Sequence, residues 1–324
     1  MPDRDSVDFL STVPLLEGLA EAELAELARV MRRRTLAEGE LLWREGHEAK
    51  GMVLIVDGKV SVTKTLPGDG AVEVADLGPG EALGEIPLVD GGQHSATARV
   101  TESTTVLSLN RLDFAALVSR RDPSAFALKR RVAAVVAERL RRQLGVLAGS
   151  LSEEVAGEPG PEVARACPEF EFTGAPNSAY VRRMATFRDF DSLALWGFLT
   201  AGRYARCPRG HTLIAEGASA AACYLTINGA VEKVLIRGDR RIRIGLAGPG
   251  QAFGYESLID GGPSPVTAIT RERALLLVLS VESFERLFHG DTDVSHVFLD
   301  VINRNLATSL RMALRPQARL AVSA

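Results

Sequence analysis

The residues of this chain that could carry out catalysis or bind a metal ion are few and scattered. Its five histidines include no pair at the spacing that places two ligands of one metal on a single helix. Its cysteines, Cys167, Cys207 and Cys223, form no Cys-x-x-Cys motif, so they indicate neither a zinc site nor a disulfide framework, and they fit a reducing cytoplasm. No GxxxxGK[ST], HExxH or GxSxG string occurs. The sequence therefore predicts no catalytic residue, no metal site and no enzyme.

One string of glycine, acidic and small residues occurs twice. LGPGEALGEIPLVDGGQHSATA (77–98) aligns with AGPGQAFGYESLIDGGPSPVTA (247–268). Upstream, TLAEGELLWREG (35–46) aligns with CPRGHTLIAEG (207–217). The second copy is one residue shorter between these two landmarks, and a hairpin loop would absorb the difference. The sequence therefore predicts two copies of one domain.

The segment between the copies has the composition of a linker. Residues 152–178 include four prolines and three glycines and show no sustained period. We therefore expect domain A at residues 1–151, the linker at 152–178 and domain B at 179–324.

Each copy reads as short strands with a helix at either end. The leucines and valine of 21–34 fall on one helical face, whereas KVSVTK (59–64) and RRIRIG (240–245) alternate with period two. Asn110 and Ser280 have the side chains of helix N-caps. The predicted fold class is mainly β with flanking helices, as two tandem jelly-roll-like β rolls, each with an N-terminal helix, a short inserted helix and a long closing helix.

The closing helix of copy A, expected at residues 124–150, carries an apolar stripe. Such a stripe can pack on the roll or form an interface with a partner helix, and periodicity alone does not decide between them. Its lysine and arginine clusters at 129–131 and 139–142 lie mostly off the stripe and are predicted to form a solvated face. The candidate interface residues are Val132, Val136, Leu140 and Leu144.

The ordered landmarks, a Gly-Glu-x-x-Leu string, a glycine turn, an Ala-Thr and a long closing helix, resemble the cyclic nucleotide-binding domain family. That family includes the sensor domains of catabolite activator proteins and the regulatory subunits of protein kinase A. The resemblance implies two tandem, divergent copies and a cyclic nucleotide as ligand rather than a cofactor. In the family, a Glu accepts from the ribose hydroxyl, and an Arg and backbone N–H groups bind the cyclic phosphate.

In copy A the resemblance places Gly84 and Glu85 at the ribose position, and Ser95 and Ala96 at the phosphate position. The position of the family's Arg holds His94. A neutral imidazole offers one donor instead of a charged planar fork, at a cost of about 1.5 to 3 kcal/mol in phosphate binding. The candidate ligand-binding residues of copy A are Gly84, Glu85, Ile86, His94, Ser95 and Ala96.

Copy B departs further from the family pattern. Tyr255 stands at the Glu position, Glu256 comes one residue late, and Ser264 replaces the Arg. Pro265 removes a backbone donor as well. These changes predict that copy B is a structural or interaction copy, or that its pocket serves another purpose. Its candidate ligand-binding residues are Gly254, Tyr255, Glu256, Ser264 and Val266.

The sequence favours a cytoplasmic regulatory or adaptor protein that senses a small anionic ligand in domain A and signals to a protein partner. A competing hypothesis is a ligand-free scaffold that forms a homodimer or docks a partner through the closing helices. A third is a nucleic-acid-associated regulator, which a net charge of −3 and the short segment RPQARLAVSA after copy B disfavour. No uncharged apolar run reaches the ~18 residues of a membrane span.

Overall fold

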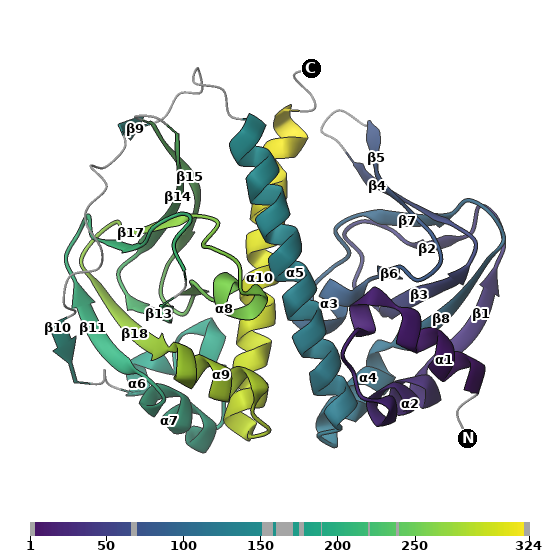
Figure 1. Cartoon of the computed structure of the whole chain (residues 1–324), viewed down its shortest axis with the longest axis horizontal. Helices are drawn as coiled ribbons and strands as arrows, with labels where there is room; N and C mark the ends of the chain where they lie inside the picture. Colours follow the sequence, from purple (N-terminus) through teal and green to yellow (C-terminus); the bar gives the residue numbers. More distant parts are fainter. Residues whose placement is uncertain are drawn as a thin grey trace. The chain divides into compact units, whose positions relative to one another are not determined.

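The computed structural model describes residues 4–65, 70–150, 158–159, 171–174, 178–188, 190–219, 221–237 and 240–320. The chain divides into two compact units, Met1–Val135 (unit 1) and Val136–Ala324 (unit 2). Each unit is an antiparallel β roll with flanking helices (Figure 1). The predicted fold class and the duplication are therefore confirmed.

The roll of unit 1 is built from two antiparallel sheets with a hydrophobic core between them. Its strands are β1 (Arg32–Leu36), β2 (Leu41–Trp43), β3 (Gly51–Asp57), β4 (Val60–Thr65), β5 (Ala71–Leu77), β6 (Ala82–Leu83), β7 (Thr97–Val100) and β8 (Thr104–Asn110). They form two sheets, with strand orders β1-β8-β3-β6 and β2-β7-β4-β5. Ile55 of β3 pairs with Val106 of β8, and both side chains are fully buried in the core between the sheets.

The helices of unit 1 agree with the sequence prediction except at the end of one helix. They are α1 (Arg4–Thr12), η1 (Pro14–Leu16), α2 (Glu21–Val30), α3 (Glu85–Asp90), α4 (Arg111–Ser119) and α5 (Pro123–Ser150). The Asn110 side chain accepts the N–H groups of Leu112 and Asp113, so the predicted N-cap of α4 is confirmed. The predicted helix over 21–34 is wrong at its end, because residues 32–34 form β1, whose backbone pairs with β8.

Unit 2 repeats this architecture. Its strands are β9 (Glu158–Pro159), β10 (Glu171–Thr173), β11 (Arg203–Cys207), β12 (Thr212–Ile214), β13 (Ala222–Asn228), β14 (Val231–Arg237), β15 (Arg240–Ala247), β16 (Ala252–Phe253), β17 (Thr267–Thr270) and β18 (Ala274–Ser280). The strand orders are β10-β11-β18-β13-β16 and β12-β17-β14-β15-β9.

The hairpin β14–β15 of unit 2 is the counterpart of β4–β5 in unit 1. The hairpin of unit 1 runs from Val60 to Leu77, and that of unit 2 runs from Val231 to Ala247. The second is therefore one residue shorter than the first. The residue missing from copy B falls in this hairpin, as predicted.

The helices of unit 2 occupy the same positions as those of unit 1. They are α6 (Ser178–Val181), η2 (Ala185–Phe187), α7 (Ser192–Thr200), α8 (Glu256–Asp260), α9 (Val281–His289) and α10 (Asp293–Leu320). Ser280 accepts the N–H of Ser283, which confirms the predicted N-cap of α9. Among the helices described, none is both long enough and apolar enough to cross a bilayer.

Two pieces of the predicted linker take part in the sheets of unit 2. β9 pairs with β15, and β10 pairs with β11, so these residues of the predicted linker form edge strands. Edge strands of two or three residues carry little periodicity, which is why the sequence did not indicate them. Most of the predicted linker lies outside the described residues.

Helix α5 contributes its second half to unit 2. All four predicted stripe residues, Val132, Val136, Leu140 and Leu144, are buried within the chain. Leu140 and Leu144 face α8, α10 and the roll of unit 2 around a small cavity. The units therefore divide inside α5, whereas the sequence placed the boundary at residue 151, where the helix ends.

The basic residues of α5 are not a uniformly solvated face. The Arg141 guanidinium donates to both carboxylate oxygens of Asp260 at 2.8 and 2.6 Å and to the carbonyl of Pro263. Lys129 is buried, with its ammonium 5.5 Å from the centre of the Phe126 ring. The predicted solvated face is wrong at these two positions, because Lys129 is buried beside Phe126 of the same helix and Arg141 binds partners on another part of the chain.

We predict that the Arg141–Asp260 pair stabilises unit 2. Arg141→Ala should lower the free energy of unfolding by about 1.5 to 3 kcal/mol, because it removes a bidentate, charge-assisted contact between partly buried groups. Urea unfolding of the full chain, read by amide hydrogen exchange in α8, measures the change.

The neighbouring Arg142 provides the matched control. It pairs with Glu138 one turn away, and both side chains are exposed, so Arg142→Ala should cost at most about 0.5 kcal/mol. Equal losses for the two variants would contradict a stabilising role of the Arg141–Asp260 pair.

Candidate functional site

The predicted ribose-binding residues of unit 1 lie where the short helix α3 begins. Gly84 precedes the helix with a φ of 80°, in the left-handed region that favours glycine. A Cβ at Gly84 would lie 2.8 Å from the carbonyl oxygen of Gly51 on β3, so only glycine permits this approach. Glu85 follows as the first residue of α3 and is buried, and Ile86 is half-buried. The fold therefore buries the Glu85 side chain at the start of α3.

The predicted phosphate-binding residues lie in the loop between α3 and β7. The His94 N–H donates to the carbonyl of His47 at 2.9 Å, and the His94 carbonyl accepts the N–H of Gly46 at 2.9 Å. The His94 side chain is only 5% exposed, whereas Ser95 is exposed and Ala96 is half-buried. Both ends of the predicted site are thus attached to the roll, and His94 faces inward.

Trp43, at the end of β2, connects the two ends of this site. Its ring stacks on the His94 ring with a centroid separation of 4.1 Å and an interplanar angle of 4°. The Trp43 ring also approaches Gly84. A Cβ at Gly84 would lie 3.2 Å from the indole Cη2. Sequence reasoning missed Trp43, although the aligned strings LLWREG and TLIAEG place it opposite Ile214 of the second copy.

The position of His94 determines its protonation state. Burial, with a smaller contribution from the charge of His47, lowers the His94 pKa from 6.5 to about 4. The imidazole is therefore neutral at physiological pH. It can act as an aromatic surface and as a neutral hydrogen-bond group, but it supplies no positive charge to an anion.

In unit 2 the corresponding helix α8 begins one residue later. Gly254 has the same left-handed conformation, with a φ of 78°. Tyr255 stands at the N-cap in a helical conformation with its side chain fully buried, and Glu256 is the first residue of the helix, also buried. The glycines at both ends of the helix keep the offset of 170 residues between the two copies, and Tyr255 stands at the position that corresponds to Glu85.

The other candidate residues of unit 2, Ser264 and Val266, are buried in local contacts. The Ser264 hydroxyl donates to the carbonyl of Val266 at 2.8 Å, and the Ser264 N–H donates to the carbonyl of Ala218 at 2.8 Å. The side chains of Ser264 and Val266 are buried. Ser264 therefore closes a loop of the protein and presents no donor comparable to the family's Arg.

A buried lysine, which the sequence analysis did not single out, lies beside Glu256. The Lys233 ammonium donates to the Ser309 hydroxyl of α10 at 3.1 Å. Burial lowers the pKa of Lys233, and the nearby Glu256 carboxylate opposes this shift. The space left among Lys233, Glu256, Ser309 and the α5 leucines is about 10 Å³, enough for roughly one water molecule.

Comparisons with solved structures found matches with low TM-scores. The regulatory domain of Toxoplasma gondii protein kinase A with cAMP is 17% identical over 91% of this chain and 96% of that chain, with a TM-score of 0.34. A Trypanosoma cruzi regulatory subunit of a cAMP-independent protein kinase A, bound to guanosine, is 15% identical over 90% of both chains, with a TM-score of 0.33. The Thermus thermophilus catabolite activator protein is 30% identical over 43% of this chain and 73% of that chain, with a TM-score of 0.33.

A search of curated proteins found no match. The family model described as the cyclic nucleotide-binding domain matches residues 33–121 and 205–291, which together make up more than half of the chain. These two regions are the β rolls of units 1 and 2 with their inserted helices, which confirms the resemblance drawn from the repeated string. The chain belongs to the cyclic nucleotide-binding domain family.

Proposed function

We propose that this protein is a non-enzymatic, cytoplasmic regulator in which unit 1 senses a small anionic ligand of the cyclic-nucleotide type. The observation that carries the proposal is the Gly84–Glu85 pair, which stands at the start of α3 with the Glu85 side chain buried. A carboxylate in this place can accept a hydrogen bond from a ribose hydroxyl, which is the contact that the family makes at this position. The ligand's role and the protein partner are parts of the same proposal.

The ligand in unit 1 would meet a neutral site at the phosphate end. His94 offers an aromatic ring and one neutral nitrogen, and Trp43 covers that ring. The family's phosphate-binding charge is therefore missing, so we expect weaker binding of a cyclic phosphate than in family members with Arg.

Unit 2 serves in this proposal as a structural and docking copy. Tyr255 stands in place of the ribose-binding Glu, and the residual cavity of about 10 Å³ beside Glu256 is far smaller than a nucleotide. Its closing helix α10 and the second half of α5 already contact this cavity through Ser309 and Leu144. The small size of this cavity supports a unit 2 that binds no nucleotide.

Signalling in this proposal runs through α5. Residues 123–135 of this helix belong to unit 1, and Arg141 attaches its second half to Asp260 at the end of α8. A ligand that binds one packing of α5 in unit 1 more tightly than another would shift the population of the two packings. The continuous helix would carry that shift to the Arg141–Asp260 pair, where a partner protein could detect it.

A ligand-free scaffold is the second candidate function, and Trp43 is the observation that favours it. The indole contacts both Gly84 and His94, so it fills part of the space between the ends of the site. In a scaffold, both rolls would act as docking modules only. A homodimer through the closing-helix stripe needs those residues exposed, whereas Val136, Leu140 and Leu144 are buried within the chain.

Calorimetry with cyclic AMP, cyclic GMP and cyclic dinucleotides separates the two candidates. A sensor should bind at least one of them, and His94→Arg should strengthen binding about 10- to 100-fold, because it restores a bidentate charged donor to the phosphate. Glu85→Ala should abolish the binding. Trp43→Ile introduces the residue that unit 2 has at this position, Ile214. It tests whether the indole limits the access of a ligand to the site.

The matched control for His94→Arg is Ser264→Arg in unit 2, where we expect no gain. Absence of binding to wild type, His94→Arg and the His94→Arg/Trp43→Ile double variant at millimolar ligand would contradict the sensor and leave the scaffold.

The buried His94 also predicts an acid-sensitive unit 1. The His94 pKa is about 4 in the folded protein, against 6.5 for a free histidine, so between these values the unfolded chain binds the additional proton. The free energy of unfolding should have its full value above pH 6.5 and should fall by about 3 kcal/mol as the pH drops to 4. Urea unfolding across this range, compared between wild type and His94→Gln, isolates the contribution of His94 from that of other histidines. An NMR titration that places the His94 pKa near 6.5 would refute the prediction.

A further inference from the structure

Helix α7 of unit 2 exposes two large apolar side chains. Leu193 is 75% exposed and Trp196 is 66% exposed, and they lie three residues apart on the outer face of the helix. The opposite face packs into the unit through Ala194, Leu195, Phe198 and Leu199. The exposed pair therefore plays no part in holding α7 on the roll.

The same helix in unit 1 shows that the fold does not require these residues. Helices α2 and α7 occupy corresponding positions in the two copies, as do the short helices η1 and η2 that precede them. The buried positions are apolar in both, as in the pair Leu27 and Phe198. The exposed positions of Leu193 and Trp196 correspond to Ala22 and Ala25 of unit 1. The outward face of this helix thus carries large apolar side chains in unit 2 and alanines in unit 1.

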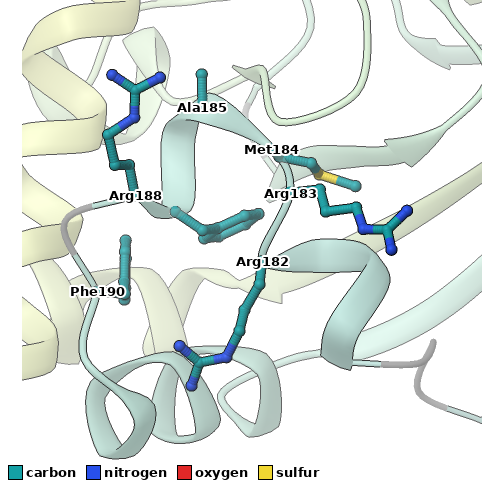
Figure 2. Close-up of a pocket in the computed structure, with 7 residues that line it drawn as sticks. Arg182, Arg183, Met184, Ala185, Arg188 and Phe190 are labelled. Atoms are coloured by element: carbon teal, nitrogen blue, oxygen red, sulfur yellow. The ribbon is translucent and has the colours of Figure 1, made fainter.

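Three arginines surround a pocket formed by the segment that precedes α7 (Figure 2). The pocket has a volume of about 270 Å³, and its apolar lining comes from Met184, Phe187 and Phe190, among others. The Arg182 guanidinium donates to the Ser192 hydroxyl on the first residue of α7 at 2.8 Å, which links the rim of the pocket to the start of the helix that exposes Trp196. The described lining residues include Arg182, Arg183 and Arg188 and no carboxylate.

The arginines are also specific to unit 2. The corresponding positions in unit 1 hold Ser11, Thr12 and Glu17, so one copy is basic where the other is neutral or acidic. All three arginine side chains are exposed, and Figure 2 shows their guanidinium groups spread around the pocket and pointing away from one another. This spacing suits several carboxylates along an extended chain better than it suits a single small anion.

We infer that Arg182, Arg183, Arg188, Leu193 and Trp196, here called the Arg–Trp surface, dock an acidic segment of a partner protein. The three cations would attract the carboxylates of that segment, and the pocket would bury one of its apolar side chains. Arginine and tryptophan are the residues that most often dominate the energetics of protein interfaces. A lipid surface offers no single side chain to fill a pocket, which favours a peptide as the occupant.

This inference goes beyond the proposed function because it does not require a ligand in unit 1. Peptide binding is measured without nucleotide, so a failure of ligand sensing leaves the Arg–Trp surface testable by itself.

The probe is a phage library of short random peptides, selected on the full chain at low ionic strength. We expect the selected peptides to combine several Asp or Glu residues with an aromatic or long aliphatic residue. Synthetic copies, labelled with fluorescein, should bind in anisotropy assays and should lose at least tenfold in affinity when their acids are replaced by amides. Raising the salt concentration should weaken the binding.

The decisive variants copy unit 1 onto unit 2. Leu193→Ala/Trp196→Ala and Arg182→Ser/Arg183→Thr/Arg188→Glu should each reduce peptide affinity at least tenfold, with the melting temperature unchanged because these side chains are exposed. Leu112→Ala is the matched control, since Leu112 is equally exposed on unit 1, and it should bind peptide like wild type.

Three results would overturn the inference. They are selected peptides without acidic enrichment, equal affinity of wild type and both variants, and loss of phosphatidylserine-vesicle binding in the variants without any peptide binding.

Discussion

The structure depends on one close backbone approach, which both copies contain. The left-handed Gly84 brings the start of α3 against the carbonyl of Gly51, and Gly254 repeats this against Ala222 and Ile214 in unit 2. A side chain at either glycine would clash or strain the turn. Because this contact places the next residue inside the roll, the identity of that single residue, Glu85 or Tyr255, changes the chemistry of the whole site.

The two copies show how one backbone can serve two purposes. Unit 1 keeps the carboxylate at the start of the inserted helix and lines the far end with stacked Trp43 and His94 rings. Unit 2 replaces the carboxylate by a buried tyrosine and leaves space for roughly one water beside Lys233. The backbones agree because the glycines and apolar strands agree, whereas the pockets differ through a few side chains.

The same separation holds at the surface. The buried positions of α2 and α7 are apolar in both copies, because they pack on the rolls. The outward positions are under no such constraint, so alanines in unit 1 can become Leu193 and Trp196 in unit 2 without affecting the fold. Comparison of two copies in one chain therefore distinguishes residues that serve the fold from residues that serve another purpose.

The sequence by itself determined the duplication, the β-roll fold, the two helix N-caps and the place of Gly84 and Glu85, because these features depend on local patterns and on the alignment of the two copies. Only the tertiary structure decided that Trp43 stacks on His94, that Arg141 binds Asp260, and that Lys233 meets Ser309. Each of these pairs joins residues that lie far apart in the sequence. Their contact depends on strand register and helix packing, and local periodicity carries no information about either.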